Sequence, residues 1–330
     1  MKSLISLLVL AIAAFAQVAP SKLAPPDAVR IEEFYRLAPT IEDKLWSGWS
    51  KVPTPLILVT ADTEFLTRYP TPPKEFKHVD EDLFARPRQY PINLQATFPA
   101  FGPPAVIVVG QPSNTESKTS TPWLFMLMHE HFHQLQWAQP GYTDAINALG
   151  LSKGDTTGMW MLNYPFPYDN PGIARAFANL RDLLLRVVNE PDGPRFRSLA
   201  NEYINARAKF FAKLSPDDHK YLAFQLWQEG IARYTEVESA EAAADYRPTP
   251  QFAALADYES FRSFAKRKRS VTLDDLSRAN LPSQKRTVVY SFGATEGFLL
   301  DRIHPNWRED YFHHMPSTDS LFTGKYRIPR

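Results

Sequence analysis

The sequence predicts an α+β fold, with a mixed α/β part over residues 17–120 and a mainly helical part over residues 121–330. Two short β-branched runs, PLILVT (55–60) and AVIVVG (105–110), end in a polar residue or a glycine, as strands do. From residue 121 on, apolar residues recur at helical spacing instead. The 330 residues are 44% hydrophobic and 22% charged, which is enough for a buried core. We therefore expect both parts to form one unit.

The mixed part begins with two expected helices. Residues 27–38 and 40–49 carry apolar side chains on one face, which is typical of amphipathic helices. Strands are expected at 55–60 and 105–110. The proline-rich stretch between them is expected to be irregular, because proline donates no backbone hydrogen bond.

The helical part is divided by pairs of a capping residue and a proline. Such a pair marks the start of a helix, because proline is tolerated in the first turn. We expect helices from Thr121-Pro122 to about Pro140, from Asn170-Pro171 to about Glu190, from about Pro194 to Leu214, from Ser215-Pro216 toward Ala240, and over 285–303.

The first sixteen residues have the order of a secretory signal peptide. Lys2 precedes an apolar run from Leu4 to Phe15, and Ala14-Phe15-Ala16 forms a small-x-small cleavage site. Cleavage is expected after Ala16, which predicts a secreted or periplasmic protein; the alternative is an uncleaved N-terminal anchor. No later stretch is apolar enough to span a bilayer, so we expect no stable membrane insertion.

Charge and cysteine content exclude several classes of function. The formal net charge is +1, from 37 basic and 36 acidic residues, and nothing here predicts a nucleic-acid partner. The basic block Lys266–Arg269 is expected in a solvated turn or at a helix end. The chain has no cysteine, so any metal must be held by His, Asp or Glu.

The stretch HEHFHQLQW (129–137) holds the pattern His-Glu-x-x-His. His129 and His133 lie one helical turn apart on one face, so both imidazoles can reach one zinc ion. Glu130 projects about 100° away, where it can reach a water molecule next to that ion. His131 points to the opposite face and is expected to be a packed or surface histidine.

A catalytic zinc site needs a third protein ligand. The metzincin pattern is excluded, because Gln136 and Gln139 stand where it requires glycine and histidine. Two acids remain as candidates: Asp144 in GYTD (141–144) and Glu229 in LWQEGIARYTE (226–236).

The segment around Glu229 resembles the second half of the gluzincin signature, as found in the aminopeptidase N family. The matching residues are Trp227, Glu229, Gly230 and Ala232, with Gln228 where that family has asparagine. YSFGATEGFLL (290–300) resembles the same family's Tyr-x-x-Gly helix. The resemblance implies a zincin-like fold, Glu229 as third zinc ligand and Tyr290 as a hydrogen-bond donor to the oxyanion.

The resemblance covers the active-site helices and has two departures. His133 and Glu229 are 96 positions apart, far more than is usual in the family, and the Gly-x-Met-x-Asn motif that anchors aminopeptidase substrates is missing. The gluzincin class is supported, whereas aminopeptidase activity is not. Gly230 is expected to let the zinc helix pack closely. Glu236 is either a surface glutamate or an acceptor for a ligand histidine.

We therefore expect an exported zinc metallopeptidase with one Zn²⁺ per chain, acting on a peptide or protein substrate. Glu130 is the expected general base. The alternatives are a zinc hydrolase of a non-peptide amide or ester, and a silent zincin-fold binding protein. Cleavage preference, endo- or exopeptidase action and oligomeric state stay open.

Overall fold

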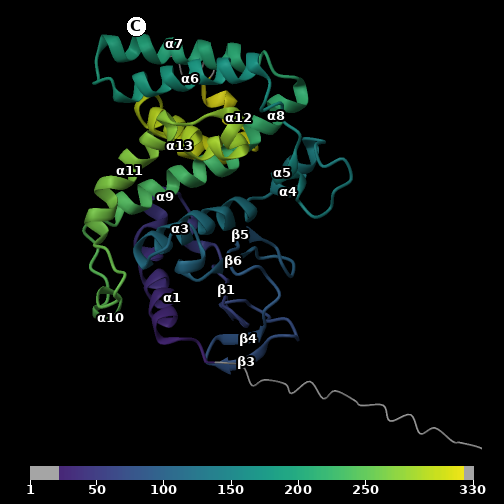
Figure 1. Cartoon of the computed structure of the whole chain (residues 1–330), viewed down its shortest axis with the longest axis vertical. Coiled ribbons are helices and arrows are strands. Elements are labelled where there is room, and N and C mark those ends of the chain that lie inside the picture. Colours follow the sequence, from purple (N-terminus) through teal and green to yellow (C-terminus); the bar gives the residue numbers. More distant parts are fainter. Residues whose placement is uncertain (1–21, 323–330) are drawn as a thin grey trace, which may run out of the picture.

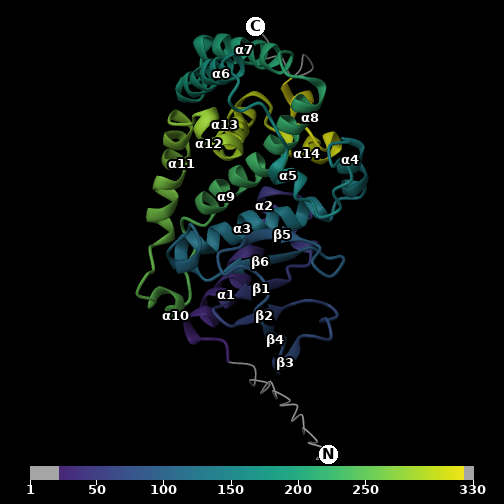
Figure 2. The ribbon, with the colours of Figure 1, turned by 45° about the vertical axis from the view of Figure 1, so that its right-hand side comes forward.

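The computed structural model describes residues 22–322, so the expected signal peptide, residues 1–16, lies outside the described residues. The fold is α+β, with 58% of residues helical, 9% in strands and one six-stranded sheet. The sheet and the first helix, α1 (Pro25–Leu37), occupy one end of the molecule (Figure 1). The long helices of the C-terminal part occupy the other end. Between the two lies α3 (Ser120–Trp137), which carries His129 and His133 (Figure 2).

The sheet has the strand order β3-β4-β2-β1-β6-β5. Neighbouring strands are antiparallel except β1 and β6, which are parallel. The strands are β1 (Leu56–Val59), β2 (Thr63–Thr67), β3 (Lys77–Asp80), β4 (Leu83–Pro87), β5 (Gln95–Phe98) and β6 (Val106–Gly110). The strands expected at 55–60 and 105–110 are thus confirmed as β1 and β6.

The stretch expected to be irregular contains the other four strands, so that expectation was wrong. These strands are short; β3 is mostly exposed and β5 is only partly buried. Their sequences lack the apolar runs that mark β1 and β6, and strand propensity depends strongly on packing context. β2 pairs with β1 and β5 pairs with β6, whereas β4 pairs with β2 and β3 pairs with β4, and a local pattern does not show these hydrogen-bonded partners.

Both faces of the sheet are covered. Leu56, Leu58 and Ile107 join the large core beneath α3, whereas Ile57 and Val108 join a smaller core on the other face. The alternation follows from the two-residue period of a strand.

The expected helix over 40–49 is shorter than predicted: α2 spans Glu42–Leu45 and ends before Gly48, which has a φ of 79°.

The helix that carries the His-Glu-x-x-His pattern, α3, begins at Ser120 with Thr119 as its N-cap residue, so the expected cap at Thr121 was wrong. Asp257 fixes this end, because its carboxylate accepts hydrogen bonds from the Ser120 backbone nitrogen at 3.0 Å and from its hydroxyl at 2.6 Å. Every residue of α3 except Pro122 and Trp137 is buried. The helix is therefore held on all sides, which keeps its side chains in fixed positions.

The C-terminal part is built from helices whose capping residues are largely those expected. Asn170 caps α6 and Ser215 caps α8 through their side chains. The helices are α4 (Tyr142–Ala148), α5 (Trp160–Asn163), α6 (Pro171–Asn189), α7 (Pro194–Phe211), α8 (Pro216–Gln225), α9 (Ile231–Ala242), α10 (Pro250–Ala253), α11 (Phe261–Ser277), α12 (Leu281–Gln284), α13 (Val288–Ile303) and α14 (Trp307–Tyr311).

The long helix expected from Ser215 toward Ala240 is interrupted. Between α8 and α9 the chain makes a π turn over Leu226–Gly230, which includes Glu229. Such single π turns within a helix are rare and are frequent at functional sites. The pattern of apolar residues does not show the interruption, because the helix continues in the same direction on both sides.

The basic block Lys266–Arg269 lies inside α11, so the expectation of a solvated turn or helix end was wrong. The Lys268 side chain is only 13% exposed. Its ammonium group contacts Glu236 of α9.

In the part of the chain that the structure describes, no helix combines the length and apolar character needed to cross a membrane.

Candidate metal centre

Three expected ligands meet between α3 and the π turn. Nε2 of His129 and Nε2 of His133 are 3.2 Å apart. Oε2 of Glu229 lies 3.6 Å from the first nitrogen and 3.4 Å from the second. The two histidines are buried and Glu229 is partly buried. Two elements that are distant in the sequence therefore bring one carboxylate and two imidazoles to one point.

The three distances fit one tetrahedral zinc ion. An ion with bonds of about 2.0–2.2 Å keeps neighbouring tetrahedral ligand atoms about 3.3–3.6 Å apart. The measured 3.2, 3.4 and 3.6 Å form a triangle of that size. Two histidines and one carboxylate are also a donor set that zinc uses in catalytic sites. The arrangement fits the expected Zn²⁺, which these three residues would hold.

The position of Glu229 depends on the contact between two glycines. A Cβ at Gly230 would lie 2.6 Å from Cα of Gly293 in α13, and one at Gly293 would lie 2.5 Å from Cα of Gly230. We expected Gly230 to pack closely against α3, the helix that carries the two histidines, and that expectation was wrong. The partner is α13, which also carries Tyr290. Because both positions are glycine, the π turn that carries Glu229 and the helix α13 that carries Tyr290 can approach each other closely.

Gln136 holds the rear of His133. Its Nδ1 donates to Oε1 of Gln136 at 2.6 Å, and Nε2 of Gln136 donates to the Tyr311 hydroxyl at 2.8 Å. Donation from Nδ1 leaves Nε2 as the metal-facing atom, the usual tautomer logic at zinc sites. Nε2 of Gln228 also lies 3.1 Å from that Nδ1. Sequence reasoning used Gln136 only to exclude the metzincin pattern and missed this role.

Glu236 lies behind the other histidine. It is 3% exposed, so the alternative of a surface glutamate was wrong. Its Oε2 is 3.7 Å from Nδ1 of His129, which is beyond hydrogen-bond distance. That nitrogen is buried and has no hydrogen-bond partner among the described residues. Burial would raise the pKa of Glu236, but Arg233 and Lys268 outweigh it and lower the pKa.

Glu130 lines the cleft beside His129. Its carboxylate Oε2 and its backbone oxygen each lie 2.9 Å from Oγ1 of Thr97 in β5. The single hydroxyl proton serves one of these acceptors at a time. Thr97 thus ties the expected general base to the outer strand of the sheet, a contact that no local sequence signal predicts.

Tyr290 lines the same cleft, with its ring centre 6.1 Å from that of His129. Its hydroxyl accepts from Nη1 of Arg286 at 3.4 Å. The same Nη1 lies 3.6 Å from Oε1 of Glu229, the carboxylate oxygen that does not face the histidines. Burial, followed by the Glu229 charge, raises the pKa of Tyr290, so its phenol stays protonated and can donate.

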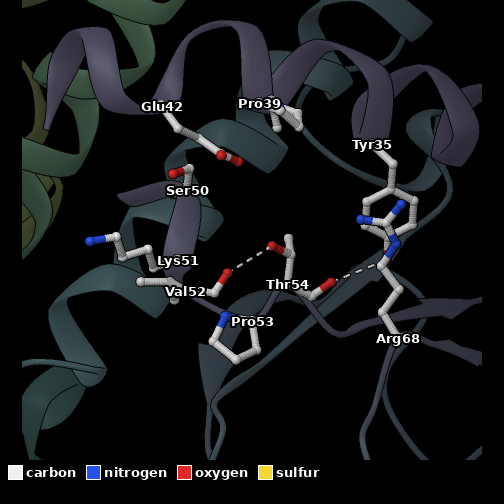
Figure 3. A pocket seen from close by; sticks show the side chains of 10 residues that line it. Tyr35, Pro39, Glu42, Ser50, Lys51, Val52, Pro53, Thr54 and Arg68 are labelled. Atoms are coloured by element: carbon white, nitrogen blue, oxygen red, sulfur yellow. Dashed lines mark hydrogen bonds between the residues drawn. The ribbon is translucent and has the colours of Figure 1, made fainter. Parts of the chain in front are cut away.

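His131 is fully buried and points away from the three ligands. Its Nδ1 contacts Gln134 at 2.8 Å and its Nε2 contacts Glu42 at 3.0 Å. His131 is therefore a packed histidine, which was one of the two expected alternatives. Glu42 also lines a separate hollow of about 350 Å³ near α1, where Figure 3 shows its carboxylate above Ser50. The other candidate ligand, Asp144, is exposed on α4 and is not part of the cluster.

The charges in the metal-free cluster stabilise each other. Burial alone would lower the pKa of His133, but the Glu229 carboxylate outweighs it and raises the pKa to about 9. Burial alone would raise the pKa of Glu229, and the two histidines hold it well below its usual range. A carboxylate held in its charged form is ready to bind a cation.

No protein-family model, no curated protein and no solved structure matches the chain.

Proposed function

We propose that this protein is a zinc metallopeptidase of the gluzincin class with a zincin-like fold. The observation that carries the proposal is the triangle formed by His129, His133 and Glu229 at zinc-like spacing. Its further support is the location of Glu130 and Tyr290 in the same cleft. The order of these residues along the chain also resembles the gluzincin signature.

A zinc ion held by these residues would lower the pKa of a water molecule and polarise a substrate carbonyl. Glu130 takes the proton of the attacking water and then passes it to the leaving amine. Thr97 keeps the Glu130 carboxylate in place during both transfers. Tyr290 donates a hydrogen bond to the oxygen of the scissile carbonyl as negative charge develops there.

A peptide substrate is favoured by the outer strand of the sheet. β5 pairs with β6 along one edge, and no strand of the described residues pairs with its other edge. An extended peptide can bind such an edge by backbone hydrogen bonds. β5 also contributes Thr97 beside the general base, and Gln95 lines the cleft. A peptide bound there would pass the metal centre.

Two alternatives keep the same metal site. A hydrolase of a non-peptide amide or ester would use the same groups without the β5 edge. A silent binding protein would need no general base, and the presence of Glu130 disfavours it. The proposal that the protein is exported rests on residues 1–16 alone.

The proposal is tested with the full mature chain, a zinc assay and a mixed peptide library. We expect about one zinc per chain and cleavage products in the library. Glu130→Gln should retain zinc and lose at least ~100-fold in rate, because a general base supplies about that much. Cleavage of esters or small amides with intact peptides would favour the non-peptide alternative. A wild-type protein that binds no zinc would contradict the proposal.

A further inference from the structure

The cleft extends well beyond the metal centre. It has a volume of about 780 Å³ and runs from His129, Glu130 and Tyr290 to α11. Its wall carries five basic residues: Arg233, Arg267, Lys268, Arg278 and Arg286. The same wall carries four acidic residues, Glu116, Glu130, Glu236 and Asp275, so the basic residues exceed the acidic ones by one.

Two of these cations are neutralised by their own partners at the outer part of the cleft. Arg267 contacts Glu259 with both Nε and Nη2, and Arg278 lies 3.0 Å from Asp275. Their side chains are 47% and 67% exposed, so water screens them further. They contribute little to the charge near the metal.

The inner cations are less well balanced. Arg233 and Lys268 share the single carboxylate of Glu236. The three side chains are 29%, 13% and 4% exposed, so this Arg233–Glu236–Lys268 cluster is largely shielded from solvent. Two positive charges on one negative charge leave an excess of one, and a charge removed from water requires a partner.

Arg286 adds a second cation whose partner is shared. It contacts Glu229 at 3.6 Å, but a bound divalent ion would draw on the same carboxylate. With the ion present, the inner cleft would hold five positive charges from Arg233, Lys268, Arg286 and the ion. The facing acids are Glu116, Glu130, Glu229 and Glu236, so four negative charges oppose them. One carboxylate would complete the balance.

We propose that the cleft selects substrates that carry a carboxylate close to the scissile bond, and that the Arg233–Glu236–Lys268 cluster recognises it. This inference rests on the proposed peptidase function. The distances suit it: the Arg233 guanidinium carbon is 5.5 Å from the Tyr290 ring centre, and that ring centre is 6.1 Å from the His129 ring centre. Successive residues of an extended peptide are about 3.3–3.6 Å apart, so a carboxylate one or two residues from the reacting carbonyl spans this gap.

The test uses peptides that differ only by Glu or Gln at each position around the cleaved bond. We expect kcat/KM to favour Glu over Gln by about 10-fold at one position, as one partly desolvated ion pair would give. Lys268→Met should bring this ratio close to one, because Arg233 and Glu236 then form a neutral pair. Lys268→Arg should restore the preference. Zinc content is measured in each variant.

The matched control is Arg262→Met on the same helix. Arg262 is 64% exposed, pairs with Asp245 and does not line the cleft, so the Glu-to-Gln ratio should not change. A second arm measures binding of the same peptides by calorimetry, which does not require turnover, to Glu130→Gln and to the double variant Glu130→Gln with Lys268→Met. The charge of Glu130 is absent from both, so a Glu preference that is lost only in the double variant belongs to Lys268. Cleavage with equal rates for Glu and Gln at every position would overturn the carboxylate proposal and leave the peptidase proposal standing. Equal binding of both peptides in a protein that cleaves nothing would overturn both.

Discussion

Oε2 of Glu229 lies 3.4 Å from Nε2 of His133, although the two residues are 96 positions apart in the chain. The intervening segment folds into α4–α8, and α6 and α7 lie at the far end of the molecule (Figure 1). The long separation, which departs from the usual gluzincin spacing, is therefore accommodated away from the metal centre. The end of the segment, in the π turn, returns to α3, where Gln136 donates a hydrogen bond to the Gln228 carbonyl.

Substitution of Glu229 and substitution of Asp144, the two candidate third ligands, should affect zinc binding differently. Glu229→Ala should weaken it at least about 10-fold, because it removes one of three ligands, whereas Asp144→Ala should have no effect. Competition with a chelator gives both affinities, and circular dichroism checks the fold. Stronger loss in Asp144→Ala than in Glu229→Ala would contradict the ligand assignment and the gluzincin proposal with it.

Tyr290→Phe removes only the hydroxyl that we assign to the oxyanion. The expected result is a fall in kcat of about 100-fold with retained zinc, since one such donor contributes about that much. Steady-state kinetics separates kcat from KM. If only KM rises, Tyr290 binds the substrate and does not stabilise the transition state.

Thr97→Val keeps the shape of the side chain and removes its hydrogen bond to Glu130. We expect kcat to fall about 10-fold, because a catalytic carboxylate that is less well positioned transfers protons less efficiently. Thr97→Ser retains the hydroxyl and should restore most of the activity. Equal losses in the valine and serine variants would point to packing in β5 as the cause.

Gly230→Ala places a methyl group 2.6 Å from Cα of Gly293. Because Cα of Gly293 is a backbone atom of α13, the π turn at Gly230 and α13 must move apart, which should lower the free energy of unfolding by about 1–3 kcal/mol. Zinc affinity should fall as well, since Glu229 is the preceding residue. Gly172→Ala is the control, because its nearest neighbour is the Asn170 side chain at 3.2 Å. Chemical denaturation measures both, and equal stability would contradict the close-contact argument.

Zinc and a proton should compete for His133. The pKa of about 9 in the metal-free protein means that this histidine is protonated at neutral pH, and zinc binds only the neutral form. Zinc affinity should therefore rise with pH up to about 9, by about tenfold per pH unit, and become flatter above it. Calorimetry in buffers of different ionisation enthalpy should detect about one proton released at pH 7. Zinc affinity that is constant between pH 6 and 9 would refute the competition.

Much of the fold could be predicted where the pattern is local. β1 and β6 have β-branched runs, and the helices after Asn170 and Ser215 have caps that determine their first turn. β2–β5 could not be predicted in the same way, because their stability depends on strands elsewhere in the sheet. The burial of Lys268 inside α11 also depends on a partner, Glu236, that is 32 residues away.

By itself the sequence determined that His129 and His133 share one face of a helix with Glu130 beside them, since the 3.6-residue period fixes these relations locally. The choice of Glu229 needed a resemblance to a known family. Its approach to the histidines was decided only by the tertiary structure, through the π turn and the Gly230–Gly293 contact. The same is true of Thr97 behind Glu130 and of Glu236 behind His129. Such contacts join distant segments, and their geometry follows from how whole helices and strands pack rather than from any local period.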